Sequence, residues 1–184
     1  DAGAAAKIGQ GSEYYLAHVK GQPSIEPFRI PKGWSLGVCT SPVAGRHLRG
    51  VTRGPAHSGP SGVDFDITHD RNQAQSVVWQ GKTKELEDNL GICIYVGTWS
   101  GAHFLPPANF AELVRTGMGL PVTEEDLMEH YAVVGRNLEK AFNCLHTNLT
   151  REDDLPPQRF QREEVKQGAY RGFKADVDQY NGML

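Results

Sequence analysis

The stretch Asp88-Asn89-Leu90-Gly91-Ile92-Cys93-Ile94-Tyr95 lies near the middle of the chain and combines a carboxylate, a glycine and a cysteine. A carboxylate such as that of Asp88 accepts two N–H bonds from an aminopyrimidine edge, which is how proteins hold pterins. Gly91 has no side chain to keep a ligand away from the backbone, and Cys93 ligates iron once it is deprotonated. Taken alone, such residues are more often a glycine that ends a helix and a buried cysteine.

Two helices are predicted on either side of this stretch. Residues 71–90 have helical character, and Gly91 ends them because glycine is the usual residue beyond a helix C-terminus. Residues 124–147 form the clearest helix, with Thr123 and Asp126 as a capping pair at its start. Its apolar residues recur in steps of three and four, which predicts a stripe that faces the core. The stripe consists of Leu127, Tyr131, Val134, Leu138, Ala141, Phe142 and Leu145.

The remaining pattern is also helical or irregular. Shorter helical segments are predicted over residues 2–8, 34–40 and 168–184. Asn109 is expected to open another helix, because Glu112 stands three residues later, the spacing of a capping box. Strand patterns are weak, with one short extended stretch at residues 13–19. The predicted fold class is therefore mainly α and multihelical.

Long irregular connections are expected, because 21 glycines and 11 prolines are many for 184 residues. The predicted connections are residues 21–36, 44–69 and 94–107, together with a charged, proline-containing turn at residues 151–159. A long irregular loop in a compact domain is usually functional or disordered. We therefore expect residues 44–69 to line a site.

Composition excludes several functional classes. The net charge of −3 gives no reason to expect nucleic acid or an anionic membrane as a partner, and there is no apolar run of membrane-spanning length. Cys39, Cys93 and Cys144 fit neither a disulfide framework nor a self-contained zinc site, so reduced thiols in a cytoplasmic protein are expected. The chain begins without Met in a helical pattern, which suggests a fragment, a processed chain or a missing front.

Four segments together resemble one known family. Asp88-x-x-Gly91-Ile92-Cys93-x-Tyr95 is similar to the Asp-x-x-Gly-Leu-Cys-x-Phe motif in the third domain of the aldehyde ferredoxin oxidoreductases, with conservative departures at Ile92 and Tyr95. The other matching segments are Thr40-Ser-Pro-Val-Ala-Gly-Arg-His47-Leu-Arg49-Gly50, Asn137-Leu-Glu-Lys-Ala-Phe142-Asn143 and Arg151-Glu-Asp153-Asp154-Leu155-Pro156-x-x-Arg159-Phe160. Lys7-Ile-Gly-x-Gly-Ser-Glu and His18-Val-Lys-Gly21 at the start also fit, so the resemblance covers nearly the whole chain in the family's order.

The resemblance implies roles for five residues. Asp88 would bind the pterin ring of a bis-pterin tungsten or molybdenum cofactor, and the backbone at Gly91 and Ile92 would pack against that pterin. Cys93 would supply one of the four thiolates of a [4Fe–4S] cluster. His47 would stand near the metal as proton donor or acceptor for an aldehyde carbonyl, although a lone histidine in such a loop is more often a surface or hydrogen-bonded residue.

Other side chains have open roles. Arg46 and Arg49 flank His47 and would either meet cofactor phosphates or have a solvated or structural role. The resemblance gives Phe104, Leu105 and Phe110 a possible place at the substrate opening. The histidines at positions 57, 69 and 103 receive no role, and the acidic residues at positions 153 and 154 are expected to be solvated or capping.

The resemblance also implies the organisation of a larger enzyme. Residues 1–21 would be the end of the middle helical domain and residues 22–184 most of the carboxy-terminal helical domain, ending before the family's terminus. The implied reaction oxidises aldehydes to carboxylic acids, with ferredoxin as the electron acceptor. The other cluster cysteines, the first pterin motif and the amino-terminal domains would lie elsewhere, so the chain alone is expected to be inactive and to expose a face that those domains cover. A homo-oligomer is possible.

Two alternatives remain open from the sequence. A member of the same family would act on another substrate, such as formaldehyde, glyceraldehyde phosphate or an aromatic thioester. A non-catalytic all-α interaction module would keep the fold and lack the chemistry.

Overall fold

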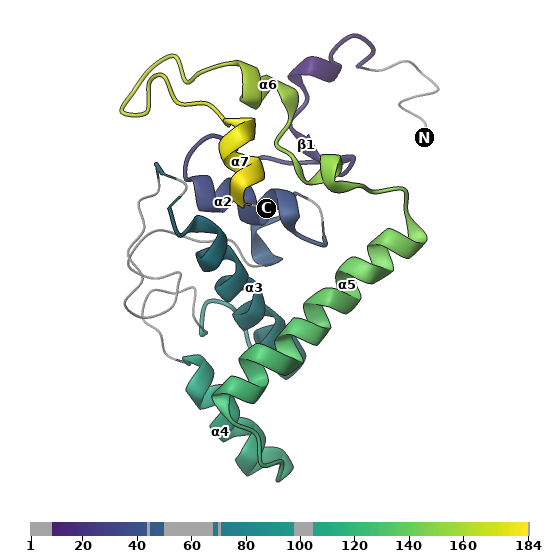
Figure 1. Cartoon of the computed structure of the whole chain (residues 1–184), viewed down its shortest axis with the longest axis vertical. Coiled ribbons are helices and arrows are strands. Elements are labelled where there is room, and N and C mark those ends of the chain that lie inside the picture. Colours follow the sequence, from purple (N-terminus) through teal and green to yellow (C-terminus); the bar gives the residue numbers. More distant parts are fainter. Residues whose placement is uncertain (1–8, 44, 50–67, 70, 98–104, 184) are drawn as a thin grey trace.

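The structure is a computed structural model that describes residues 9–43, 45–49, 68–69, 71–97 and 105–183. Helices dominate these residues, so the predicted mainly α fold is confirmed (Figure 1). The α-helices are α2 Lys32–Thr40, α3 Gln73–Leu90, α4 Pro107–Met118, α5 Ala132–His146, α6 Gln158–Arg162 and α7 Val177–Met183. The shorter turns are the 3-10 helices η1 Glu13–Tyr15, η2 His47–Arg49 and η4 Arg151–Asp154, and the π-helix η3 Asp126–Tyr131.

The long helix α3 joins two hydrophobic cores. Eighteen residues give it a length of about 27 Å, enough to reach from one core to the other. Ala74 and Val77 in its first half pack against a cluster of Val19, Phe28, Leu36, Val38, Cys39 and Tyr180. Leu86 in its second half belongs to the other cluster, against which Leu90 also packs. Helix α3 is therefore the element that connects the two parts of the fold.

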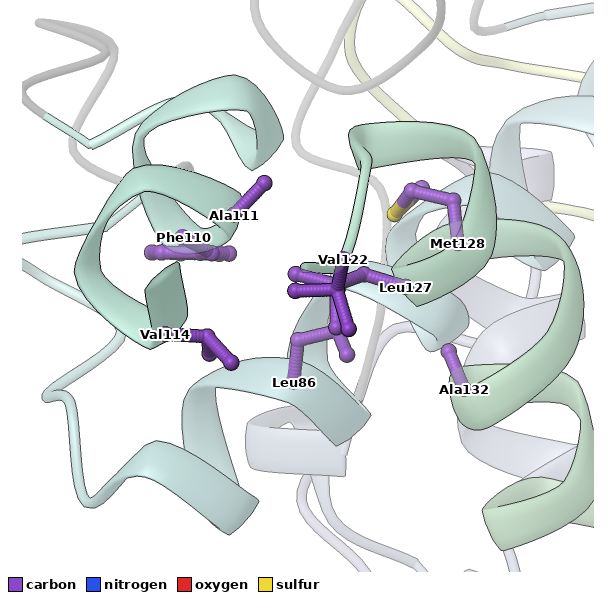
Figure 2. Packing of buried hydrophobic residues seen from close by; sticks show 8 residues of the cluster. All are labelled: Leu86, Phe110, Ala111, Val114, Val122, Leu127, Met128 and Ala132. Atoms are coloured by element: carbon purple, nitrogen blue, oxygen red, sulfur yellow. The ribbon is translucent and has the colours of Figure 1, made fainter. Parts of the chain in front are cut away.

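The second core lies among α3, α4 and the start of α5. Figure 2 shows Phe110, Ala111 and Val114 of α4 on one side of this core. Leu127, Met128 and Ala132 lie on the other side, and Val122 and Leu86 lie between the two groups. Phe110 and Ala132 are fully buried. The described residues thus place Phe110 in a packed core rather than at a substrate opening, and Leu105 packs against the same cluster. Phe104 lies outside the described residues.

A two-stranded hairpin precedes α2. Strand β1 (His18–Val19) pairs antiparallel with β2 (Gln22–Pro23), and Val19 stands opposite Gln22. The connecting residues, Lys20 and Gly21, have φ of 50° and 73°, the positive values that a two-residue type I′ turn needs at both positions. Residues 13–19 are therefore not a continuous extended stretch, because η1 occupies their first half.

Most predicted helices are present, and their ends are decided locally. Helix α2 covers the predicted residues 34–40 and begins two residues earlier, directly after Pro31. Helix α4 begins at Pro107 rather than at Asn109, because proline is favoured in the first helical turn, where its missing N–H costs nothing. In the last stretch only Val177–Met183 is helical; Gly168 and Gly172 have φ of 84° and 88°, which interrupt a right-handed helix. The predicted helix 2–8 lies outside the described residues.

The predicted capping pair at the start of the clearest helix is confirmed. Thr123 N donates to Asp126 Oδ2 at 2.8 Å, and Asp126 N donates to Thr123 Oγ1 at 3.0 Å. The backbone N–H of Thr123 is the main cause that lowers the pKa of the Asp126 carboxyl below its ordinary value. The helix that follows begins with the π-turns of η3 and continues as α5.

The predicted apolar stripe of this helix is wrong for most of its length. Leu127 is buried, but Tyr131, Val134, Leu138, Phe142 and Leu145 are between 45% and 81% exposed, and Ala141 is exposed as well. The other face of α5 packs on α3. Within the described residues, the stripe instead forms an exposed apolar face of α5.

Polar groups make the contact between α3 and α5. The buried Glu85 side chain of α3 lies against Gly135 of α5, where an added Cβ would stand 2.3 Å from Glu85 Oε1. Arg136 lies across Gly81 of α3, where an added Cβ would stand 3.5 Å from Arg136 Nε. Glycines at both positions let the two helices approach while charged side chains fill the space between them.

Gly135 and Gly117 are expected to respond with opposite sign to alanine. Gly135 lies inside the continuous helix of η3 and α5, and Gly117 lies in the last turn of α4; at helical positions alanine is normally favoured over glycine by up to about 0.5–1 kcal/mol. Gly117→Ala in α4 meets no atom within 4 Å and should raise the free energy of unfolding by that amount. Gly135→Ala collides with buried Glu85 and should lower the free energy by about 1–3 kcal/mol, as over-packing does. Urea unfolding followed by circular dichroism measures both; equal stabilisation by the two variants would contradict the packing described here.

No helix within the described residues is long and apolar enough to cross a membrane.

Candidate functional site

The Asp88–Tyr95 stretch begins at the C-terminus of α3, where the helix ends in a regular C-capping motif. Gly91 follows the helix with φ of 69°, its N–H donates to Asp88 O at 3.2 Å, and Ile92 N donates to Glu87 O at 2.8 Å. These are the two bonds of a Schellman motif, which needs a left-handed residue at the glycine position. Ile92 then packs against the second core, as the residue after such a stop usually does. The chain is thereby fixed immediately before Cys93.

The side chain of Cys93 is on the surface. It is exposed, while its carbonyl accepts N–H bonds from Val96 at 2.9 Å and Gly97 at 3.1 Å, so the backbone around it is a closed turn. An added Cβ at Gly91 would meet no atom within 4 Å, so the surface beside the turn is open. The Cys93 thiol is thus exposed on the surface, while hydrogen bonds hold the backbone of its turn.

The turn formed by residues 93–97 also packs closely against α3. An added Cβ at Gly97 would stand 2.0 Å from Oε1 of Glu87, whose side chain is fully buried. Only glycine fits there without moving that carboxylate. The backbone that follows Cys93 is thus seated directly on the last turns of α3.

Asp88 is held by two cations. Arg49 of η2 binds its Oδ2 and Lys84, one turn earlier on α3, binds its Oδ1. The second terminal nitrogen of Arg49 pairs with Glu139 of α5, which also accepts from Arg136 at 3.1 Å. The network joins η2, α3 and α5, and it leaves the Asp88 side chain 35% exposed.

Arg49 therefore brings two of the predicted site segments together. It stands two residues after His47 and contacts Asp88, five residues before Cys93. Of the two arginines that flank His47, Arg49 is an ion-pairing residue in this structure, and Arg46 is exposed. The contact between Arg49 and Asp88 therefore connects η2 with the end of α3.

His47 is held by a buried carboxylate. Its Nδ1 lies 2.6 Å from Glu26 Oε1, and the other oxygen of Glu26 accepts from Trp34 Nε1 at 2.8 Å. The imidazole and the Trp34 ring lie 5.7 Å apart at an angle of 31°. The Glu26 side chain is 7% exposed and that of His47 is 34% exposed, so the histidine reaches the surface and its partner does not.

A second ionic cluster was missed by the sequence analysis. Asp154, expected to be solvated or capping, is buried, and its Oδ1 lies 2.6 Å from Lys20 Nζ. Its Oδ2 accepts from Lys140 Nζ at 2.7 Å. The neighbouring Asp153 does cap, because its carboxylate accepts from Thr150 N at 2.6 Å. Nothing in the local pattern distinguishes the two aspartates.

Of the remaining histidines without a role, His69 is exposed, and positions 57 and 103 lie outside the described residues. Most of the predicted site loop 44–69 also lies outside them. Within the part of the chain that the structure describes, no three His, Cys, Asp or Glu side chains form a group that would hold a metal ion.

The three cysteines are expected to differ in reactivity. Burial raises the pKa of the Cys39 thiol to about 11, against the opposing effects of nearby Tyr180 and Lys20, whereas Cys93 and Cys144 are exposed. Because the thiolate is the nucleophile, iodoacetamide at mildly alkaline pH should modify Cys93 and Cys144 in the folded, metal-free chain and modify Cys39 only after unfolding. Peptide mass spectrometry measures this order. Labelling of Cys39 as fast as of Cys144 would contradict it.

The described residues form a mainly α domain. The chain belongs to the aldehyde ferredoxin oxidoreductase family: residues 2–184 match the sequence model described as "Aldehyde ferredoxin oxidoreductase, domains 2 & 3". It is similar to the tungsten-containing aldehyde ferredoxin oxidoreductase of Pyrococcus furiosus (strain ATCC 43587 / DSM 3638 / JCM 8422 / Vc1), with 26% identity over 181 residues. The match covers 90% of this chain and 28% of that protein.

Proposed function

We propose that this chain forms one side of the tungstopterin and iron–sulfur site of an aldehyde:ferredoxin oxidoreductase. The observation that carries the proposal is the single region in which Asp88, the open backbone at Gly91 and the exposed thiol of Cys93 lie within six residues, beside the segment of His47. The bound cofactors would supply two-electron oxidation of an aldehyde to a carboxylic acid and transfer of the electrons to ferredoxin. Tungsten is favoured over molybdenum because the relative is a tungsten protein.

The geometry of Asp88 fits a pterin. An ionised carboxylate has about four acceptor positions. Arg49 and Lys84 use one on each oxygen, so acceptor capacity remains on a side chain that is 35% exposed. The two N–H groups of an aminopyrimidine edge would bind there without displacing either cation.

The geometry of Cys93 fits one corner of a cluster. A [4Fe–4S] cluster takes four thiolates. Among the described residues Cys39 is buried near Tyr180 and Cys144 lies on α5, so neither joins Cys93 in a ligand set. We therefore place the other three ligands in the remainder of a longer protein, together with the amino-terminal domains. The exposed apolar face of α5 supports such an arrangement.

His47 is the residue that would move a proton. Imidazole exchanges protons near neutral pH, and this one-third-exposed ring belongs to η2, the turn whose Arg49 contacts Asp88. Oxidation of an aldehyde to a carboxylic acid adds the oxygen of water and releases two protons with two electrons. His47 would accept or donate one proton at the carbonyl.

The same proposal includes three properties of the whole protein. Residue 21 would mark the boundary between the middle and the carboxy-terminal domains, the protein would be cytoplasmic, and it would form a homo-oligomer.

Metal analysis of the longest natural form that contains this chain tests the function. Tungsten with about four irons per chain, and aldehyde-dependent reduction of ferredoxin, are the expected results. A His47→Gln variant should keep the metals and lose most of the turnover. A metal-free natural protein without this activity would refute the proposal and favour a non-catalytic module.

A further inference from the structure

We propose that Glu26 is the positioning residue of His47, which it holds as the tautomer with its proton on Nδ1, so that Nε2 carries the lone pair. The inference rests on the proposed proton-transfer role of His47 for its catalytic meaning, but the positioning is a property of this chain alone. Its basis is the 2.6 Å contact between His47 Nδ1 and a carboxylate oxygen of a side chain that is 7% exposed.

The donor and acceptor inventory around Glu26 fixes the tautomer. An ionised carboxylate only accepts hydrogen bonds, so Nδ1 must carry the proton in this contact. Glu26 Oε2 is already the acceptor of Trp34 Nε1–H at 2.8 Å, and an indole N–H only donates. Each oxygen of the carboxylate thus serves one N–H donor. The neutral imidazole then presents Nε2 as a base, the form required to accept a proton.

The backbone on both sides of the contact is held by one buried hydroxyl. Ser24 Oγ accepts from Glu26 N at 3.3 Å and donates to Gly45 O at 3.2 Å. Gly45 has φ of 68°, and an added Cβ there would stand 3.3 Å from Ser24 Cβ. Ser24 therefore ties the segment of Glu26 to the segment that begins two residues before His47. The pair is positioned from two directions, whereas a surface ion pair formed by chance has flexible ends.

Charged groups on the neighbouring elements are engaged elsewhere. On the same turn as His47, Arg49 pairs with Asp88 of α3 and Glu139 of α5, and Lys84 of α3 pairs with Asp88. Lys32 at the start of α2 binds Gln179. Arg46 is exposed on the approach to η2. Glu26 is therefore the carboxylate that contacts the imidazole among the ion pairs of the described residues.

Glutamine at position 26 tests the shared-acceptor geometry. His47 Nδ1 and Trp34 Nε1 contact different oxygens of Glu26. In glutamine one of these two positions becomes an NH₂ donor, so in this geometry the side chain cannot accept from both. We expect Glu26→Gln to shift the neutral imidazole toward the tautomer with its proton on Nε2, with Nδ1 accepting from the new NH₂. Nitrogen-15 NMR of histidine-labelled full chain, assigned with His47→Gln, distinguishes protonated from unprotonated ring nitrogens. Glu112→Gln on α4, an exposed position, is the matched control and should leave the spectrum unchanged.

Removal of the competing donor should restore the original tautomer. In Glu26→Gln/Trp34→Phe the amide oxygen has a single N–H donor to serve, so His47 Nδ1–H regains its acceptor. A purely structural role for Glu26 predicts no such rescue. An unaltered chain whose neutral His47 carries its proton on Nε2 would overturn the inference without any substitution, and so would a Glu26→Gln/Trp34→Phe spectrum identical to that of Glu26→Gln.

Kinetics of the metal-loaded natural protein separate this inference from the proposed function. Glu26→Gln should lower kcat about 10- to 100-fold, the range for partners that orient a reacting group, with KM for the aldehyde nearly unchanged. Full activity of His47→Gln would refute the catalytic role while the NMR result still decides the positioning. Full activity of Glu26→Gln beside an inactive His47→Gln would overturn the positioning alone.

Discussion

Replacement of Asp154 by alanine is expected to lower the free energy of unfolding by about 3–5 kcal/mol, the cost of leaving a buried charge unpaired. Asp154 lies 2.6 Å from Lys20 Nζ, and the two side chains are 9% and 4% exposed. Without the carboxylate, the Lys20 ammonium would keep only the backbone carbonyl of Cys39.

Lys140, the second cation that contacts the Asp154 carboxylate, provides the control for this prediction. Lys140 is 47% exposed and lies 2.7 Å from Asp154 Oδ2, so Lys140→Ala leaves Asp154 paired with Lys20 and removes only a solvated contact. It should cost about 1 kcal/mol or less. Urea unfolding of both variants measures the difference. A double variant, Lys20→Met/Asp154→Leu, should recover much of the lost stability. Equal losses for Asp154→Ala and Lys140→Ala would show that the buried pair is not the cause.

Replacement of Cys93 by alanine is expected to abolish the iron content of the natural protein, and with it aldehyde-dependent reduction of ferredoxin. A cluster that loses one of four thiolates is generally not retained, and electrons then have no path from the pterin. Because the Cys93 side chain is exposed, the same change should alter the free energy of unfolding of the metal-free chain by no more than about 0.5 kcal/mol. Loss of iron with unchanged stability would therefore identify a ligand rather than a folding defect.

Cys144→Ala is the matched control for the cluster prediction. Cys144 is also exposed, but it lies on α5 and outside the Asp88–Cys93 motif. This variant should keep about four irons and full turnover. Iron retained in Cys93→Ala, or lost equally in Cys144→Ala, would remove Cys93 from the proposed ligand set.

Short-range features of the fold were predicted from the sequence. The helix that Gly91 ends, the Thr123–Asp126 capping pair and the helix over residues 34–40 are all present. Each depends on residues no more than a few positions apart, so local backbone chemistry decides it. The helical pattern and the weak strand signals also predicted the mainly α fold, which the structure confirms. The family resemblance assigned His47, Asp88 and Cys93 to one site; that they bind cofactors or transfer protons stays a prediction.

The sequence by itself thus determined where helices end and which short motifs belong together. The tertiary structure decided which face of each helix is covered. The sequence shows that α5 has an apolar face and a polar face, but only distant residues supply the charges that satisfy the polar one. Arg49 pairs with Glu139 across 90 positions, and Lys140 pairs with Asp154 after an intervening turn. Because those partners are absent from any local window, both the exposed apolar face of α5 and the contact between Glu26 and His47 were beyond prediction from pattern alone.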